Sequence, residues 1–420
     1  MNNRSLFLLL LSLAAATSVL ANSTLTSVTA SQRWPWNGKV DIDYTLTSSA
    51  TFPVFRVAFK GQIENGEIFV LNNLEGEGAC GVVLGKGVKR VTWNSTTQKP
   101  STNTSDAKFN VIALDVSGND SKYLKLDLSD YTMTPSQTGP HDPADPNATQ
   151  PVACKTTEIW FRRINNGTFW MGSSTTEPGR EPSSGVYEDR HQVTITKPFY
   201  IGVLECTDAH YAKINDNSTI TNQTPRLQIM TLDLRGATNG LTWPAKTDYR
   251  VDDNSFFGRM RKKTGHGLKF DLPTEAQWEL AARDKGDGTY HGDYVWNNGR
   301  YFYFASSNVT DWTTLDRVAQ HNDQTGKEGV VHEVGWKEPG LNGLYDIHGN
   351  AWEYCLDHYL QHLGSSAVTD PVGSFSSSAA YTVKGGSIYK TDPPGNCRLA
   401  MRMSKNKRNY NIGFRIAIHY

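Results

Sequence analysis

Oxygen-bearing side chains gather in residues 342–357, around Gly349. Asp346, Asn350 and Glu353 are the acceptors, and aromatic residues separate them. Because Gly349 lacks a Cβ, the backbone there can turn sharply and direct carbonyl oxygens inward. Carboxylate, amide and carbonyl oxygens are the ligands that Ca²⁺ prefers. The segment therefore predicts either a calcium site or a loop held by Asx turns, with its aromatic side chains in the core.

Cysteine thiols are the second group of side chains that can do chemistry. No Cys-x-x-Cys motif occurs, so the chain encodes neither a zinc knuckle nor a thioredoxin-type redox pair. An odd number of cysteines leaves at least one thiol unpaired or bonded to another molecule. A disulfide between Cys355 and Cys397 is the favoured pairing, since both lie in the C-terminal part. The five cysteines are Cys80, Cys154, Cys206, Cys355 and Cys397.

The clearest helix precedes the oxygen-rich segment and covers residues 274–283. Thr274 is its predicted N-cap, and Gln277 completes a capping box three residues later. Glu275 and Glu279 resemble a catalytic carboxylate pair. Capping and solvation explain both without an active site, and that is the favoured interpretation.

Short alternating runs separated by turn residues cover residues 23–130. Val40, Ile42, Tyr44 and Leu46, for example, share one face of a predicted strand. This pattern predicts an all-β sandwich domain that supports or adheres rather than catalyses. Residues 131–157 contain five prolines among small polar residues, which predicts an extended linker. Residues 158–420 are predicted to form a second domain of different composition, rich in glycine and aromatic residues.

Composition and the first residues restrict location and partners. Acidic and basic residues balance at 42 each, so neither nucleic acid nor an acidic membrane surface is a predicted partner. Residues 1–21 have the charge, apolar core and small-residue end of a signal peptide, with a retained anchor as the alternative. No other segment approaches the roughly 20 apolar residues of a spanning helix. The mature chain is therefore expected to be exported to the periplasm, the cell envelope or the medium.

Four separated blocks of the second domain together resemble one family, the formylglycine-generating enzyme or sulfatase-modifying-factor domain. The resemblance implies a variant of the C-type lectin fold with many ordered loops, and hence an α+β chain with the sandwich in front. The blocks are Phe-Trp-Met-Gly at 169–172 with Glu-Asp-Arg-His-Gln-Val at 188–193, Leu-Pro-Thr-Glu-Ala-Gln-Trp-Glu at 272–279, Gly-Leu-Tyr-Asp-Ile-His-Gly-Asn-Ala-Trp-Glu at 343–353, and Gly-Gly-Ser at 385–387 with Gly-Phe-Arg at 413–415.

The family's enzymes oxidise a cysteine of a client sulfatase to formylglycine, with O₂ and a copper ion held by two cysteine thiolates. Soft thiolates suit Cu(I), so both sulfurs are required. The two family positions fall here at Lys390 and Gly395, and Cys397 matches only if a gap is introduced. Copper binding is therefore doubtful. Cys397 remains a weak catalytic candidate, because the neighbouring Arg398 could lower its pKa.

The resemblance also implies a calcium site. It assigns a side-chain ligand to Asp346, backbone carbonyl ligands to Gly349 and Ala351, and a carboxylate ligand to Glu353. The side-chain oxygens and the glycine are all present. Structural calcium is therefore the expected cofactor.

Two functions follow from these residues. The favoured one is a non-catalytic binding or scaffold module that takes an exported protein or a glycan as its ligand. The alternative is a divergent formylglycine-generating oxidase that acts on a sulfatase client through Cys397, or another oxidoreductase reaction in the same groove.

Overall fold

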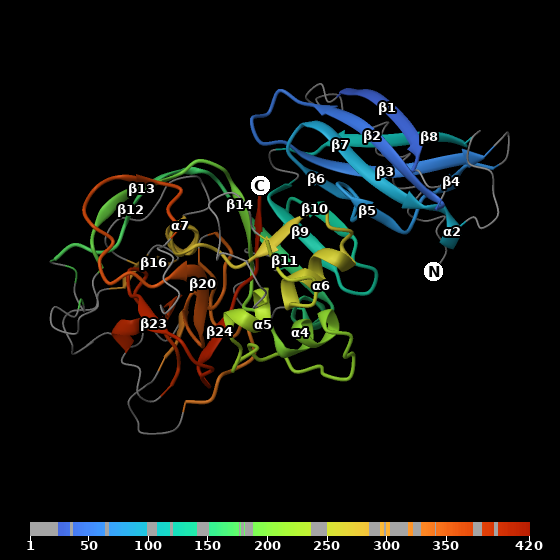
Figure 1. The fold of residues 1–420 in the computed structure, drawn as a ribbon. Helices are drawn as coiled ribbons and strands as arrows, with labels where there is room; N and C mark the ends of the chain where they lie inside the picture. Colours follow the sequence, from blue (N-terminus) through green and yellow to red (C-terminus); the bar gives the residue numbers. More distant parts are fainter. Residues whose placement is uncertain are drawn as a thin grey trace. The chain divides into compact units, whose positions relative to one another are not determined.

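The computed structural model shows two compact units that divide after Ser117 (Figure 1). Each unit has its own hydrophobic core. The residues that the structure describes are 24–33, 37–63, 67–98, 107–117, 121–140, 151–175, 177, 180, 188–236, 250–284, 295–297, 300–302, 318–321, 329–340, 342–372, 380–389 and 394–420.

The first unit consists of two antiparallel sheets. One sheet has the order β1-β2-β7-β5, and in the other β3 pairs with β4, β6 and β8. Alternate residues of both sheets meet in one core around Trp93, whose ring contacts Phe69 and Phe109. The elements are β1 (Thr24–Gln32), β2 (Lys39–Thr47), β3 (Val54–Ile63), β4 (Phe69–Val70), β5 (Leu74–Gly76), β6 (Val82–Leu84), β7 (Gly87–Asn94), the short helix α2 (Ser95–Gln98) and β8 (Ala107–Asp115).

A six-stranded antiparallel sheet forms one part of the second unit. Its order is β10-β9-β11-β14-β25-β15, which joins both ends of the unit's sequence. The strands are β9 (Tyr123–Asp127), β10 (Met133–Ser136), β11 (Glu158–Ile164), β14 (Phe199–Gly202), β15 (Lys269–Asp271) and β25 (Ala417–His419), and α3 (Val152–Thr156) precedes β11.

The strand pairing in this sheet places the domain boundary earlier in the chain than predicted. The sequence interpretation placed residues 123–130 in the sandwich and residues 131–157 in a linker, yet β9 pairs with both β10 and β11. The physical reason is burial, since Leu124, Leu126 and Met133 are almost wholly inaccessible to solvent. Pro135 lies within β10 itself, opposite Leu124, and does not prevent the two strands from pairing. Residues 141–150, the centre of the predicted linker, lie outside the described residues.

Smaller sheets and short helices complete the second unit. The order β23-β22-β20-β24 forms a four-stranded sheet, β12-β13-β21 a three-stranded one, and β18 with β19 and β16 with β17 form pairs. The strands are β12 (Gly167–Met171), β13 (His191–Ile195), β16 (Val295–Asn297), β17 (Arg300–Phe302), β18 (Ala319–Gln320), β19 (His348–Gly349), β20 (Trp352–His358), β21 (Val368–Thr369), β22 (Tyr381–Lys384), β23 (Met403–Lys405) and β24 (Ile412–Phe414). The helices are α4 (Asp208–Ile214), α5 (Thr231–Arg235), α6 (Phe256–Lys263), α7 (Glu275–Arg283) and the 3₁₀ helix η3 (Pro394–Cys397).

Helix α7 packs against β12, β13, β20 and β22, and it begins as predicted. The Thr274 side chain accepts a hydrogen bond from the Gln277 backbone, and the Gln277 side chain accepts one from the Thr274 backbone. Trp278 then enters the core that α7 shares with β12 and β13. The expectation that Glu275 and Glu279 are solvated is wrong. Both are buried, because Arg402 pairs with the first, and Arg283 and Lys384 pair with the second.

The oxygen-rich segment contains a strand that its irregular sequence concealed. All seven residues of β20 are buried, so the strand shows no alternation of polar and apolar residues. Its neighbours β22 and β24 cover both of its edges. Among the described residues, no helix has both the length and the apolar character that a bilayer-spanning segment requires.

Gly349 offers a direct test of this packing. Its φ is +95°, and a Cβ there would lie 1.9 Å from the carbonyl oxygen of Gln320, the residue that it faces across the β18–β19 pair. We expect Gly349→Ala to lower the free energy of unfolding by about 3 kcal/mol or more, through strain and overpacking. Gly364→Ala is the matched control, because Gly364 has φ +80° with nothing within 4 Å of its added Cβ. Urea unfolding measures both, and equal losses would contradict this packing.

Candidate functional site

The structure brings the oxygen-rich segment against the segment where the family's copper cysteines lie. The backbone N–H of Gly349 donates to the carbonyl of Gly385 at 2.7 Å. A Cβ on Gly386 would lie within 3 Å of the backbone of η3, so only glycine permits this approach. His348 Nδ1 lies 2.7 Å from the carbonyl oxygen of Cys397, and since a carbonyl only accepts, this nitrogen carries the proton. The two motifs therefore form one site.

Cys397 is buried in this site rather than presented to a substrate. Only 1% of its surface is exposed, at the end of η3. Gly395, one of the two family copper positions, supplies no side chain, and Lys390, the other, lies outside the described residues. The predicted disulfide is wrong, because neither Cys355 nor Cys397 forms a disulfide bond in the structure. Cys355 instead packs in the apolar core of α7, where a cysteine behaves as a small hydrophobic residue.

Arg398, which follows Cys397, is committed to two buried carboxylates. It donates to both oxygens of Glu188, at 2.5 and 2.8 Å, and to Glu177 at 3.0 Å. Burial raises the pKa of Glu177 to about 7 against the opposing charge of Arg398. Burial also opposes ionisation of Glu188, but the hydrogen bonds and the charge of Arg398 outweigh it and lower the pKa of that carboxyl. The guanidinium of Arg398 is therefore engaged by the carboxylates of Glu177 and Glu188.

The predicted calcium ligands occupy different environments. Asp346 has a left-handed backbone, with φ +56°, and its Oδ2 accepts a 2.6 Å hydrogen bond from the backbone of Gly335. Its Oδ1 is buried and has no hydrogen-bond partner. The backbone N–H of Ala351 donates to Glu205, and the N–H of Gly349 donates to Gly385, as described above. Of the two predicted side-chain ligands, only Asp346 has a buried carboxylate oxygen without a hydrogen-bond partner.

Glu353 is instead the partner of an arginine and a tryptophan. Its Oε1 accepts a 2.6 Å bond from Nη2 of Arg415, and its Oε2 accepts a 2.7 Å bond from the indole nitrogen of Trp278. Nε of Arg415 lies within 3.1 Å of both carboxylate oxygens. All three side chains are buried. The carboxylate therefore has its hydrogen-bonding positions filled by protein groups.

Glu205 is a member of this cluster that sequence reasoning missed. Its carboxylate accepts from Asn350 Nδ2 at 2.6 Å and from the backbone of Ala351 at 3.1 Å. Burial raises the pKa of Glu205 well above the usual carboxyl value, and the charges of Asp346 and Glu353 raise it further. The available signal was a single carboxylate in the otherwise apolar run after β14, since a buried acid needs a specific partner.

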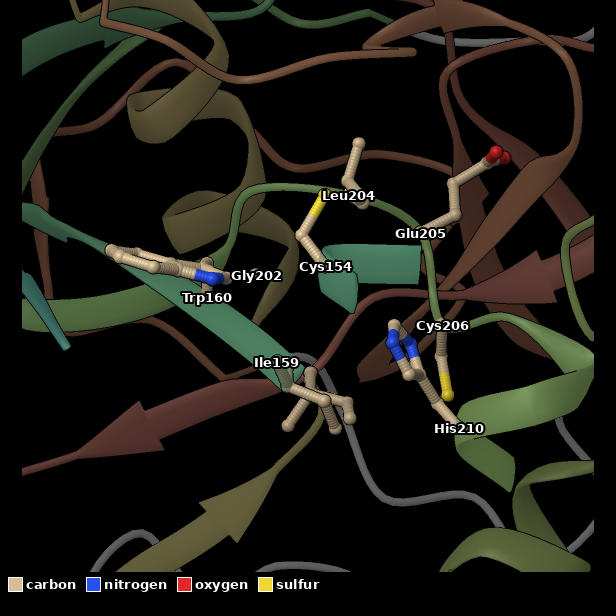
Figure 2. Close-up of a pocket in the computed structure, with 9 residues that line it drawn as sticks. Cys154, Ile159, Trp160, Gly202, Leu204, Glu205, Cys206 and His210 are labelled. Atoms are coloured by element: carbon tan, nitrogen blue, oxygen red, sulfur yellow. The ribbon is translucent and has the colours of Figure 1, made fainter. Parts of the chain in front are cut away.

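A small cavity beside Glu205 contains two cysteines and a histidine (Figure 2). Its volume of about 10 Å³ has room for about one water molecule. Burial raises the pKa of Cys154 to about 12, raises that of Cys206 well above its usual value, and lowers that of His210 to about 4. Figure 2 shows the two sulfur atoms pointing in different directions. The cavity therefore offers protonated thiols and a neutral imidazole rather than a soft-metal centre.

The predicted residues match a calcium ion only in part. Asp346 offers a buried oxygen without a partner, whereas both oxygens of Glu353 are bound by Arg415 and Trp278. Within the described ranges, no three His, Cys, Asp or Glu side chains converge closely enough to hold a metal ion. The predicted ligand set needs only two such side chains, together with two carbonyl groups.

Comparison with known proteins identifies the class of domain that this fold and site define. The model of the sulfatase-modifying factor enzyme 1-like domain matches residues 146–420, which is more than half of the chain. The chain belongs to this family. The matched region begins after the first unit and includes α7, β20 and η3.

Two curated relatives are named formylglycine-generating enzyme. The one from Streptomyces coelicolor is 33% identical over 154 residues, which are 35% of this chain and 46% of the relative. The one from Thermomonospora curvata is 35% identical over 128 residues, which are 28% of this chain and 38% of the relative. The chain thus spans less than half the length of these relatives. A solved structure, PvdO from Pseudomonas aeruginosa, aligns with 66% of this chain and 99% of its own at 21% identity, with a TM-score of 0.43.

The Glu279 cluster predicts a specific acid sensitivity. Oε1 of Glu279 accepts from the backbone of Gly172 and from Arg283, and Oε2 accepts from Lys384 at 2.7 Å. Burial alone would raise the pKa of Glu279, but the charges of Lys384 and Arg283 outweigh it and hold the pKa at about 2, against 4.5 for an ordinary glutamate. A depressed pKa stabilises the fold fully above about pH 4.5, and this stabilisation is lost as the pH falls towards 2.

We expect Glu279→Gln to cost about 3 kcal/mol of unfolding free energy at pH 7, because it leaves buried cations without a full partner. The difference from the unchanged protein should shrink between pH 4.5 and pH 2. Urea unfolding across this range measures it. Asp216→Asn is the control, because Asp216 is exposed and pairs with the partly exposed Lys263, where an ion pair is worth about 1 kcal/mol or less. A deficit of the same size at pH 7 and pH 2 would contradict the assignment.

Proposed function

We propose that this chain is an exported sulfatase-modifying-factor-like protein whose second unit is a non-catalytic binding or scaffold module. The observation that carries the proposal is a single buried cysteine, Cys397, packed in the place where the family's oxidases hold a thiolate pair. Gly395 occupies one of the two pair positions and cannot ligate through a side chain. The domain fold and the structural motifs are otherwise retained.

Three further thiols of the second unit support this proposal, because burial favours their protonated form. Burial raises the pKa of Cys355 well above its usual value, and the nearby carboxylates of Glu275 and Asp357 raise it further. Burial also raises the pKa values of Cys154 and Cys206. A Cu(I) site needs thiolate character, which these environments oppose.

An exposed surface near the same site suits a binding role. Val330 and Trp336 are 72% and 62% exposed, and the ring of His332 lies 5.4 Å from that of Trp336. The backbone N–H of His332 donates to the side chain of Asn350, which fixes this segment to the oxygen-rich segment. Exposed aromatic and apolar side chains on a positioned segment are typical of surfaces that bind proteins or sugars. An exported protein or a glycan is therefore the proposed ligand.

The second candidate function is a divergent formylglycine-generating oxidase. The names of both curated relatives favour it, and so does the contact of η3 with Gly386. In this function Cys397 would have to act as the only thiol of the site. Its backbone carbonyl is bonded to His348. The neighbouring Arg398 is already bound to Glu177 and Glu188. The same groove could instead host another oxidoreductase reaction.

Mass spectrometry separates the two functions. We expect a peptide bearing Cys-x-Pro-x-Arg to keep its full thiol mass after incubation with this protein, Cu(I) and O₂, because no thiolate pair is present to hold copper. Cys397→Ser is the matched variant, and it should give the same result. Loss of the peptide's thiol mass with the unchanged protein, but not with Cys397→Ser, would establish the oxidase.

The mass of the intact exported protein tests export, because removal of residues 1–21 leaves a chain that begins at Asn22.

A structural calcium ion at Asp346 forms part of the proposal. The buried Oδ1 supports it, because an oxygen without a hydrogen-bond partner is costly unless a cation or a water molecule satisfies it. The backbone carbonyls of Gly349 and Ala351 are the proposed neutral ligands. Glu353 would have to share its carboxylate with Arg415, so it is the weakest member of the set. The ion would hold the loop; no chemical step is assigned to it.

Thermal melting tests the calcium site. Because calcium would bind only the folded state, we expect the melting temperature to rise by about 5 °C at a calcium concentration 100 times the dissociation constant, relative to EDTA. Asp346→Asn should remove most of this rise, whereas Asp252→Asn, at a partly exposed site elsewhere, should leave it intact. A melting temperature that does not change with EDTA and calcium would exclude the site.

A further inference from the structure

A larger cavity lies in the second unit, and its lining within the described residues includes none of the predicted catalytic or calcium residues. Its volume is about 200 Å³, compared with roughly 150 Å³ for a cavity that admits benzene. Five separate parts of the chain form its walls: the turn between β13 and β14, strand β15, the start of α7, the residues after β21 and the end of β25. Concave sites built from several segments are where proteins hold small ligands.

Two buried side chains of the lining, Thr274 and Gln277, have hydrogens left to donate. The Thr274 hydroxyl oxygen accepts from the Gln277 backbone, and no group in the described part of the chain accepts the hydroxyl hydrogen. His419 Nε2 lies 3.0 Å from the carbonyl oxygen of Leu272, so Nε2 carries the proton and Nδ1 is an acceptor. The Gln277 amide nitrogen, 3.3 Å from Nδ1, donates one hydrogen there and keeps its second. Buried donors need partners, which a ligand or water in the cavity must supply.

The more exposed side chains of the lining carry charges of both signs. Lys269 and Tyr420 already have interaction partners within the protein. Lys197 forms no hydrogen bond or ion pair with the part of the chain that the structure describes, so its ammonium group can donate to a ligand. Asp370 accepts one hydrogen bond at each carboxylate oxygen, both from Thr196. Because a carboxylate has about four lone-pair positions, about two remain to accept from a ligand.

The groups that remain available therefore combine donors with an acceptor and have no excess of either charge. A purely anionic ligand would face the carboxylate of Asp370, and a purely cationic ligand would face the ammonium of Lys197, which disfavours both. An uncharged ligand with many hydroxyl groups avoids this conflict, because each hydroxyl both donates and accepts. Apolar wall is also present, and it is supplied by Ile195, Pro198, Pro371 and Val372.

We propose that this cavity binds one uncharged pyranose sugar. The donors of Thr274, Gln277 and Lys197 match the oxygens of the sugar, and the open lone pairs of Asp370 match its hydroxyl hydrogens. The apolar wall matches the C–H groups of the ring. Lys197 and Asp370 are exposed, so the mouth of the cavity is open to solvent and one sugar substituent can extend out of it. This site is separate from the calcium site and from the exposed surface around Trp336.

Saturation-transfer NMR titration of the full chain with D-glucose, D-galactose and D-mannose tests this site. We expect saturable binding of at least one of these sugars. Lys197→Met and Asp370→Asn should each weaken it at least fivefold, because each removes a hydrogen bond to a charged group. Both variants should fold, since Lys197 is exposed and asparagine tolerates the φ of +44° at position 370. A melting curve verifies this.

Two control variants separate this cavity from the rest of the surface. Lys262→Met removes an exposed lysine of α6 outside the cavity and should bind the sugar as the unchanged protein does. Trp336→Ala removes the exposed ring of the surface that the proposed function uses, and it should also leave this binding unchanged.

Two results would overturn the proposal. One is the absence of saturable binding of all three sugars. The other is binding that either cavity variant retains at full strength; if Trp336→Ala then abolishes it, the sugar binds at the exposed surface instead. Because neither the copper assay nor the calcium melt involves this cavity, failure here leaves the scaffold function standing, and failure there leaves this site standing.

Discussion

The second unit depends on one buried ion pair, between Arg415 and Glu353. The guanidinium of Arg415 also donates to the carbonyls of Gly202 and Tyr345, so it joins the end of β14 and the loop before β19 to strand β20. Trp278 attaches α7 to the same carboxylate. Removing one partner of such a pair leaves a buried charge unpaired, at a cost of about 3–5 kcal/mol. The end of β14, helix α7, residues 345–353 and the segment of Arg415 thus share one electrostatic centre.

Similar pairs order the irregular segments around this centre. Arg398 ties η3 to Glu188, and Arg402 ties the segment after η3 to Glu275 at the start of α7. A buried charge must find its partner at a fixed place, so each pair specifies a loop position that apolar packing alone would leave open. The cost of desolvation is met by bidentate geometry, which arginine provides and lysine does not. This explains how long stretches without regular secondary structure are held in place.

Contacts between residues that are close in sequence were predictable, whereas contacts between residues far apart in the sequence were not. The capping box at Thr274 was predictable because both partners lie within one turn, and the family was predictable because its motifs are contiguous. By contrast, the partner of Glu353 lies 62 residues away and that of Arg398 lies 210 residues away. No local pattern encodes such pairs, so the sequence reveals neither the arginine partner of Glu353 nor the burial of Glu279. The membership of β9 in the second unit was missed for the same reason, since strand pairing is non-local.

Under the proposed function, this chain keeps the fold of its family without the family's copper chemistry. The residues that hold the domain together are present and engaged, whereas the thiolate pair is reduced to one buried thiol, Cys397. Measuring Cu(I) affinity by competition with a chromophoric Cu(I) chelator tests this most directly. We expect the chain to take no copper from the chelator, and Cys397→Ser to behave identically. One equivalent of Cu(I) held tightly by the unchanged chain and lost in Cys397→Ser would contradict it.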